Sequence, residues 1–248
     1  MAGLALKKRR NPLAIAIVTA CALGAATQTR AQLEEVLVTA QKRSENLQNI
    51  PIAITAFDAG AMQARQITSV QDLRLSAPNV SYSKGNFTGS NFKIRGIGQD
   101  LVAATSDAGV GIHVNDVPLQ DPRLYETEYY DIDQLVILRG PQGTLYGRNS
   151  TGGAVNMITS RASVDEMLGN IEGQYGNHDT IRVKGMVNIP LGDTLALRFA
   201  GISLQRDGYT RNLATGNDID DRDQWSLRGS LLWLPADNTA INFMASYS

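Results

Sequence analysis

The stretch RGPQGTLYGRNSTGGAVN, residues 139–156, carries more information about the fold than any other part of this chain. Its 18 positions hold five glycines, and its only charged residues are Arg139 and Arg148. Glycine accepts positive φ and lets other segments approach the backbone closely. The stretch has neither the GxxxxGK[ST] pattern of a phosphate loop nor a GxGxxG at the start of a helix, which argues against nucleotide binding. It predicts a glycine-rich turn between strands at 135–138 and 154–159.

Three further motifs accompany this stretch: EEVLVTAQKR at 34–43, FKIRGIG at 92–98 and VGIHVNDVPL at 110–119. In this order and at this spacing, the four motifs resemble the plug domain of TonB-dependent outer-membrane receptors. The resemblance covers residues 34–160. It implies an α/β plug domain followed by the start of an antiparallel transmembrane β-barrel.

The N-terminus has the pattern of an export signal. Residues 7–10 are basic, 12–26 are uncharged and mostly apolar, and Thr29-Arg30-Ala31 offers a small-x-small cleavage site. We therefore expect residues 1–31 to be a signal peptide, because the apolar stretch is shorter than the roughly 20 residues of a spanning helix. Cys21, the only cysteine, follows Val18-Thr19-Ala20 and leaves open an alternative, cleavage before a lipidated Cys21.

The charge balance argues against a nucleic-acid partner. Five of the 23 basic residues and none of the 24 acidic residues lie in 1–31, so the remainder carries a net charge of −6. Nucleic-acid-binding domains are usually basic. After residue 31 no apolar stretch is long enough for a spanning helix, so any membrane-spanning role falls to strands.

The chain is expected to divide into a TonB-box region and linker at 32–50, a plug domain at 51–161 and the first about five barrel strands at 162–248. Within the plug, Asp58 and Ser69 are expected to cap short helices that reach residues 66 and 75. The expected plug strands are 52–57, 80–83, 91–95, 110–115, 134–139 and 153–159.

After Arg161 the pattern changes to period-two alternation, which is typical of strands with one apolar face. The alternating segments are 169–175, 181–189, 195–200, 225–233 and 241–247. Alternation slips at Gly201, which we interpret as a bulge. An ordinary antiparallel sheet with one wet face is the alternative. Two tight turns, at 190–193 and 235–238, and a long polar loop at 207–224 favour an outer-membrane barrel.

Two tryptophans support the same interpretation. Trp225 and Trp233 share one face and lie roughly 26 Å apart along a strand, at about 3.3 Å per residue. They are therefore placed to lie near the two membrane interfaces. Plugged transporters use about 22 strands, so we expect the barrel to be incomplete in this chain.

The sequence contains no catalytic constellation, so we expect a protein that is not an enzyme and has no cofactor or metal. His113 and His178 have no cysteine or second histidine at ligand spacing. The run Asp218, Asp220, Asp221 and Asp223 leaves calcium binding open, but it lacks the glycine and glutamate of an EF-hand loop. The alternative for this run is a solvated loop.

The resemblance implies two functional elements. An extended segment binds TonB, of the TonB–ExbB–ExbD complex, by strand addition; the matching residues are Glu34, Glu35, Val36, Leu37, Val38, Thr39 and Ala40. A first strand of the plug is the alternative for 36–39. Arg95 and Arg139 match plug arginines that pair with barrel carboxylates, and solvent-exposed strand ends are the alternative for them.

Ligand contacts in the family come from outward-facing loops, here 85–91, 97–108 and 119–125. The candidates are Gln99, Asp100, Ser106, Gln120 and Tyr125, although ordinary surface loops have the same composition. The resemblance implies an importer in the Gram-negative outer membrane, surrounded by lipid, that takes up a scarce ligand such as a ferric-siderophore complex. Cobalamin, an oligosaccharide or a truncated fragment without transport activity are the alternatives. The short segment before Glu34 leaves no room for a signalling domain and favours transport alone.

Overall fold

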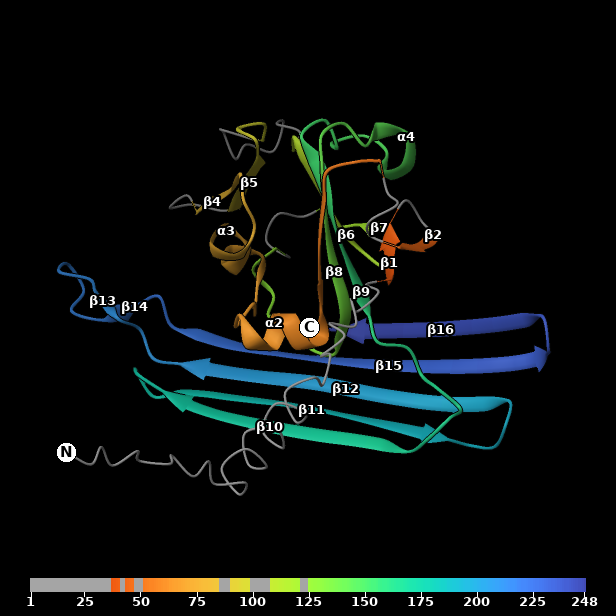
Figure 1. The fold of residues 1–248 in the computed structure, drawn as a ribbon. Helices are drawn as coiled ribbons and strands as arrows, with labels where there is room; N and C mark the ends of the chain where they lie inside the picture. The colour runs from red at the N-terminus through yellow and green to blue at the C-terminus, as the bar shows by residue number, and fades with distance from the viewer. Residues whose placement is uncertain (1–36, 41–42, 47–50, 85–89, 99–107, 121–124) are drawn as a thin grey trace, which may run out of the picture. The chain divides into compact units, whose positions relative to one another are not determined.

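The computed structural model describes residues 37–40, 43–46, 51–84, 90–98, 108–120 and 125–248 (Figure 1). The chain divides into two units, Met1–Glu35 and Val36–Ser248. The expected signal peptide, Cys21 and Glu34 to Val36 lie outside the described residues. No helix in the described part of the chain is long and apolar enough to cross a membrane.

The first of two five-stranded sheets forms the core of the plug. Its strands follow the order β3-β8-β9-β6-β7, and β6 and β9 are the only parallel neighbours among those described. Leu135 to Leu138 in β8 and Ala154 and Val155 in β9 are completely buried, so both strands are continuous apolar runs. The bounds are β3 Ile54–Asp58, β6 Val110–Val114, β7 Val117–Pro118, β8 Ile132–Arg139 and β9 Gly153–Thr159.

Short helices close one side of this core, as the caps predict. The Asp58 carboxylate accepts a 2.6 Å hydrogen bond from the Ala61 amide at the start of α2 (Ala59–Ala64). Asp72 accepts hydrogen bonds from the Thr68 and Ser69 amides, both at 2.9 Å, beside the 3₁₀ turn η2 (Val70–Asp72), which continues into α3 (Leu73–Ser76). Met62, Val70 and Leu73 are thereby packed into the plug core.

Two hairpins complete the plug. Strands β4 (Val80–Lys84) and β5 (Ser90–Ile94) pair with each other, and so do β1 (Leu37–Ala40) and β2 (Arg43–Asn46). The expected plug strands are confirmed, and β6 and β7 form a hairpin within the motif at 110–119, whereas β2 was not predicted.

The glycine-rich turn between β8 and β9 is also confirmed. Gly140 and Gly153 have φ of +94° and +148°, and a Cβ at Gly153 would lie 2.2 Å from the Leu138 carbonyl oxygen. Glycine is therefore required where the chain returns to β8. The turn also contains one unpredicted helical turn, α4 (Gly143–Tyr146).

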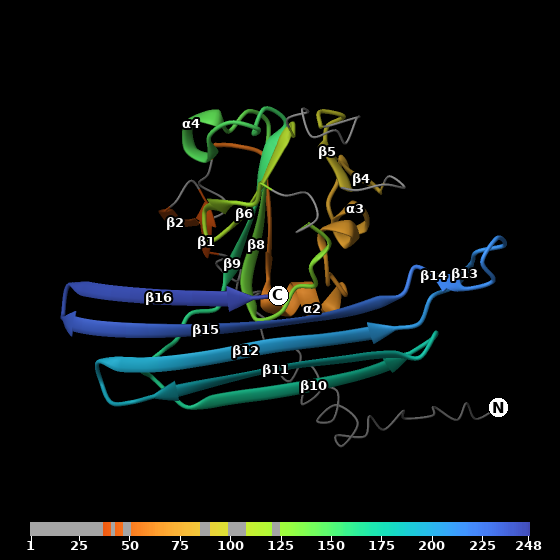
Figure 2. The same ribbon diagram turned by 180° about the vertical axis from the view of Figure 1, so that it is seen from behind.

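The second sheet is antiparallel, with the order β10-β11-β12-β15-β16 (Figures 1 and 2). Its outer face is apolar and exposed: Ile171, Phe199 and Phe243 are all at least half exposed, and the rings of Trp225 and Tyr247 lie 5.3 Å apart. The predicted alternation is thereby confirmed. The bounds are β10 Leu168–Gly176, β11 Thr180–Pro190, β12 Leu195–Arg206, β15 Arg222–Ala236 and β16 Thr239–Tyr247.

The turns of this sheet fit the expected pattern only in part. Residues 191–194 and 237–238 are short turns at one end. At the other end, the long 207–221 segment carries the small hairpin β13 (Thr210–Arg211) and β14 (Asp218–Ile219), but the 177–179 turn beside it is short. The Asp207 amide donates to the His178 carbonyl at 2.9 Å, so these two connections lie together.

The bulge expected at Gly201 is wrong. Pairing of β12 with both β11 and β15 continues through Gly201 without a shift. Gly201 lies at an outward position covered by Leu227, whose Cδ2 is 2.7 Å from an added Cβ. The apolar residues that follow, Ile202 and Leu204, point inward and are buried because the plug covers them there. The irregularity instead lies between Trp233 and Ala236 in β15.

Candidate functional site: the interface between plug and sheet

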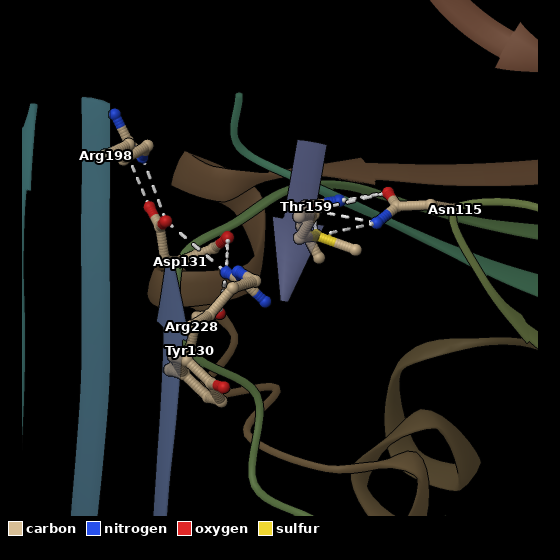
Figure 3. Close-up of polar contacts among 7 residues, drawn as sticks. Asn115, Tyr130, Asp131, Thr159, Arg198 and Arg228 are labelled. Atoms are coloured by element: carbon tan, nitrogen blue, oxygen red, sulfur yellow. Dashed lines mark hydrogen bonds and ion pairs between the residues drawn. The ribbon is translucent and has the colours of Figure 1, made fainter. Parts of the chain in front are cut away.

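Asp131, immediately before β8, joins the plug to two arginines of the second sheet (Figure 3). Arg198 of β12 donates from Nε and Nη2 to the two carboxylate oxygens, at 2.9 and 2.5 Å. Arg228 of β15 donates from Nη2 to Oδ2 at 3.3 Å. All three side chains are less than a tenth exposed. A carboxylate removed from water to this extent depends on its cationic partners for stability.

Arg228 also holds the backbone at this point. It donates to the carbonyl oxygens of Tyr130 and Asp131, at 3.0 and 2.7 Å, and its guanidinium lies 4.7 Å from the centre of the Tyr130 ring. Asp131 has φ of +50°, in the left-handed region. A non-glycine residue there costs of order 1–3 kcal/mol and persists only where its surroundings enforce it. We call Tyr130, Asp131, Arg198 and Arg228 the Asp131 cluster.

A second carboxylate lies three residues earlier. Arg182 of β11 donates to Glu128 Oε1 at 3.1 Å, and Arg222 of β15 lies 3.8 Å from the same oxygen. Burial raises the pKa of Glu128, while Arg182 and Arg222 act in the opposite direction. We call these three residues the Glu128 cluster. In both clusters the plug supplies the carboxylate and the sheet supplies the arginines.

Two further contacts involve side chains without net charge. The Asn115 amide donates to Thr159 Oγ1 at 2.9 Å and lies 3.5 Å from the sulfur of Met244 in β16 (Figure 3). Asn188 of β11 is fully buried and bonds the chain that leaves the plug: it accepts from the Ser163 amide and donates to the Ser163 and Glu166 carbonyls. The plug is therefore joined to β11, β12, β15 and β16 by polar contacts.

The arginines expected to form the lock lie elsewhere. Arg139 is half-buried and donates to Thr55 Oγ1 of β3, within the plug. Burial and the nearby Arg95 lower the pKa of Arg139. Arg95 is exposed, with φ of +54°. Among the described residues neither arginine forms an ion pair with a carboxylate, so a lock formed by these two stays a prediction.

The other predicted site residues are dispersed. Leu37 to Ala40 form β1, paired with β2, while the preceding part of the expected TonB segment is outside the described residues. Gln99, Asp100 and Ser106 also lie outside them, and Gln120 is exposed. Tyr125 is a core residue, 6% exposed, whose hydroxyl donates to the Leu119 carbonyl at 3.3 Å. The Tyr125 side chain is therefore packed in the core and is not presented on a loop surface.

The histidines and aspartates singled out in the sequence do not form a metal site. His113 is buried in β6, 3.3 Å from the Tyr146 carbonyl oxygen, and burial lowers its pKa. His178 lies in the turn after β10. In the part of the chain that the structure describes, no three His, Cys, Asp or Glu side chains gather in a way that could hold a metal ion, the aspartates at 218–223 included.

Comparison with known proteins agrees with this architecture. Residues 46–154 match the TonB-dependent Receptor Plug Domain family. The pesticin receptor of Yersinia enterocolitica is 30% identical over 85% of this chain and 31% of its own length. The iron-regulated outer membrane virulence protein of Vibrio cholerae is 28% identical over 70% of this chain and 28% of its length.

The solved structures agree as well. The ferric yersiniabactin uptake receptor FyuA of Yersinia pestis matches with a TM-score of 0.69 and 28% identity, over 79% of this chain and 31% of that one. The plug and the strands after it thus match outer-membrane receptors of Gram-negative bacteria. The chain belongs to the TonB-dependent receptor family and spans about a third of the length of the curated relatives it matches. Those relatives are receptors and transporters, not enzymes.

Proposed function

We propose that this chain takes part in the TonB-driven import of a ferric siderophore complex across the outer membrane. The observation that carries the proposal is the pairing of Asp131 and Glu128 with four arginines of the sheet. An importer must hold its plug against the wall and also release it. Ion pairs suit this cycle, because their charges regain hydration when the contact opens and so offset part of the lost attraction.

The choice of ligand rests on the relatives. One relative is a ferrioxamine receptor of Yersinia enterocolitica, another a ferrichrome transporter of Escherichia coli, and the FyuA structure is described as a ferric yersiniabactin uptake receptor. A vitamin B12 transporter of Vibrio vulnificus, 24% identical, supports cobalamin as the alternative ligand. Ferric chelates predominate among these names, and we therefore favour them.

The energy for import is proposed to arrive through residues 34–40. Of these, Leu37 to Ala40 have an extended backbone, which is the conformation that strand addition to TonB requires. We place the boundaries at residue 31 for the signal peptide, 50 for the linker and 161 for the plug. Gln99, Asp100, Ser106 and Gln120 are the proposed ligand contacts.

Uptake of radiolabelled iron in cells that produce the receptor tests this function. The probes are ferric yersiniabactin, ferrioxamine and ferrichrome, with labelled vitamin B12 for the alternative. Val38→Pro removes a backbone donor and blocks strand addition, so uptake should stop while binding at the cell surface continues. Val38→Ile is the matched control and should import normally. Uptake that continues in Val38→Pro cells, or in cells without TonB, would contradict TonB-driven import through this segment.

A further inference from the structure

The segment that connects the plug to the second sheet is fastened at both of its ends. It comprises residues 160–167, between β9 and β10, and forms neither helix nor strand. At its first end, the Ser160 amide donates at 3.1 Å to the Asp131 carbonyl, which also accepts from Arg228. At its second end, it is bonded by the side chain of Asn188 in β11. The first fastening thus involves the plug, whereas the second involves the sheet alone.

The carboxamide of Asn188 bonds three backbone groups of this segment. Its Oδ1 accepts from the Ser163 amide at 2.9 Å, and its Nδ2 donates to the Ser163 and Glu166 carbonyls, both at 2.8 Å. Asn188 is completely buried. Because an asparagine side chain offers one carbonyl oxygen and two N–H donors, a single residue of the sheet satisfies all three groups. The segment would lose all three hydrogen bonds if it left Asn188.

A turn within the segment makes this contact possible. The Ser163 hydroxyl bonds to the Asp165 carboxylate, and the Asp165 amide donates back to Ser163 Oγ at 3.1 Å. Local bonds of this kind between side chain and backbone stabilise turns. The turn brings the carbonyls of Ser163 and Glu166 to the same side chain, so it matches the geometry of the Asn188 carboxamide.

Asn188 also lies at the point where the sheet is most sensitive to a pull on the plug. It pairs with Leu168, the first residue of β10. A pull on the preceding segment would enter the sheet at this pair and separate β10 from β11 one pair at a time. Separated strands would expose backbone groups for which lipid offers no partners. Asn188 transfers the pull to β11 instead, which is paired on both sides, with β10 and β12.

We propose that Asn188 marks the end of the moving part of the plug: the chain before Ser163 moves during import, and the chain from Ser163 onward stays on the sheet. Asn188 is thus a positioning residue that shields the pairing of β10 with β11 from the force applied to the plug. The proposal rests on the import function proposed above, because TonB would supply that force.

A disulfide at this contact tests where movement ends. Ser163→Cys with Asn188→Cys replaces the hydrogen bonds by a covalent bond, and the only native cysteine, Cys21, lies in residues 1–31. Once the disulfide has formed, uptake of the radiolabelled probes should equal that of the unaltered receptor. The control is Asn115→Cys with Met244→Cys, whose native side chains meet across the plug and β16. This disulfide holds the plug itself, so it should stop uptake until it is reduced.

Removal of the contact tests the shielding. Asn188→Leu lacks all three hydrogen bonds. In cells that contain TonB and import a probe, added protease should cleave this variant near β10, with loss of the full-length receptor. In cells without TonB, the variant should be as resistant as the unaltered receptor, and this TonB dependence separates shielding from a merely structural role. Asn170→Leu, at an exposed position on the same face of β10, is the matched control and should resist protease in both kinds of cell.

The other outcomes overturn the proposal in distinct ways. Uptake that stops with the disulfide between positions 163 and 188, and returns on reduction, would show that the segment must leave the sheet. Uptake that continues with the disulfide between positions 115 and 244 would leave Asn188 no movement to limit. Equal cleavage of Asn188→Leu with and without TonB would make Asn188 a structural residue only. These three results leave the import function intact. If the unaltered receptor takes up none of the four probes, the proposed function itself fails, and this inference with it.

Discussion

Two parts of the same interface differ in how the plug meets the second sheet. At β12 and β15, buried charges cross directly from one to the other through Asp131. Farther along the sheet, Lys184 of β11 pairs with Glu172 of β10, and a cavity lies between these residues and the plug. Glu128 lies between these extremes, with a 3.1 Å contact to Arg182 and a longer one to Arg222. The difference indicates that the buried charged attachment is concentrated at β12 and β15.

The largest effect is expected from Asp131→Asn, which removes the attachment while keeping the shape of the side chain. Arg198 and Arg228 would be left as buried, unpaired cations, at a cost of about 3–5 kcal/mol. The plug of the purified receptor should unfold at lower denaturant concentration and become accessible to protease. Cells should also admit large antibiotics such as vancomycin.

Asp133→Asn is the matched control, because Asp133 is exposed two residues further along β8. It should behave like the unaltered receptor. Equal denaturation midpoints for Asp131→Asn and Asp133→Asn would mean that the Asp131 cluster contributes nothing to attachment.

A smaller effect is expected from Arg198→Lys, which keeps the charge and can donate one hydrogen bond to Asp131 but not the two parallel bonds of the guanidinium. One charge-assisted bond fewer corresponds to about 1.5–3 kcal/mol. In a double-mutant cycle with Asp131→Asn, the two losses should not add, because both remove the same contact. Strictly additive losses in the denaturation midpoints would show that Arg198 acts independently of Asp131.

The sequence predicted most of the fold because the signals were local. Alternation, helix caps at Asp58 and Ser69, and the glycine-rich turn each depend on a few neighbouring residues. The misses also have specific reasons. Helix α4 is a single turn within a glycine-rich run. The apolar residues after Gly201 were interpreted as a bulge because the plug residues that cover them are remote in sequence.

The site was harder to predict. Asp131 lies 67 residues from Arg198 and 97 from Arg228, so no spacing rule connects them. The resemblance directed attention to plug arginines, whereas the described interface pairs plug carboxylates with sheet arginines. One feature of the sequence could have indicated the site. Arg182, Arg198 and Arg228 occupy the polar, inward positions of strands with period-two alternation, and a buried charge at such a position needs a partner.

The Glu128 cluster should make the attachment depend on pH. Burial raises the folded-state pKa of Glu128, so the folded receptor binds this proton more tightly than the unfolded chain does. The stabilisation linked to this proton is fully present below the unfolded pKa and is lost as pH rises through the raised folded pKa. Glu128→Gln should flatten this part of the profile of unfolding free energy against pH. An identical profile in the variant would show that Glu128 does not titrate between the two pKa values.

The smallest effect is expected at β16, where the plug has no charged contact among the described residues. The sulfur of Met244 lies 3.5 Å from Asn115 Nδ2 and 3.6 Å from Thr159 Oγ1. Asn115 and Thr159 are also hydrogen-bonded to each other. Because thioether sulfur is a weak acceptor, Met244→Leu should cost less than about 1 kcal/mol. Met167→Leu, at an exposed position before β10, is the control for the loss of a methionine alone. The denaturation midpoints of the two variants should lie close together, and both should stay well above that of Asp131→Asn. A loss at Met244 as large as that at Asp131 would mean that β16 also anchors the plug, and the contrast between charged and uncharged parts of the interface would then no longer hold.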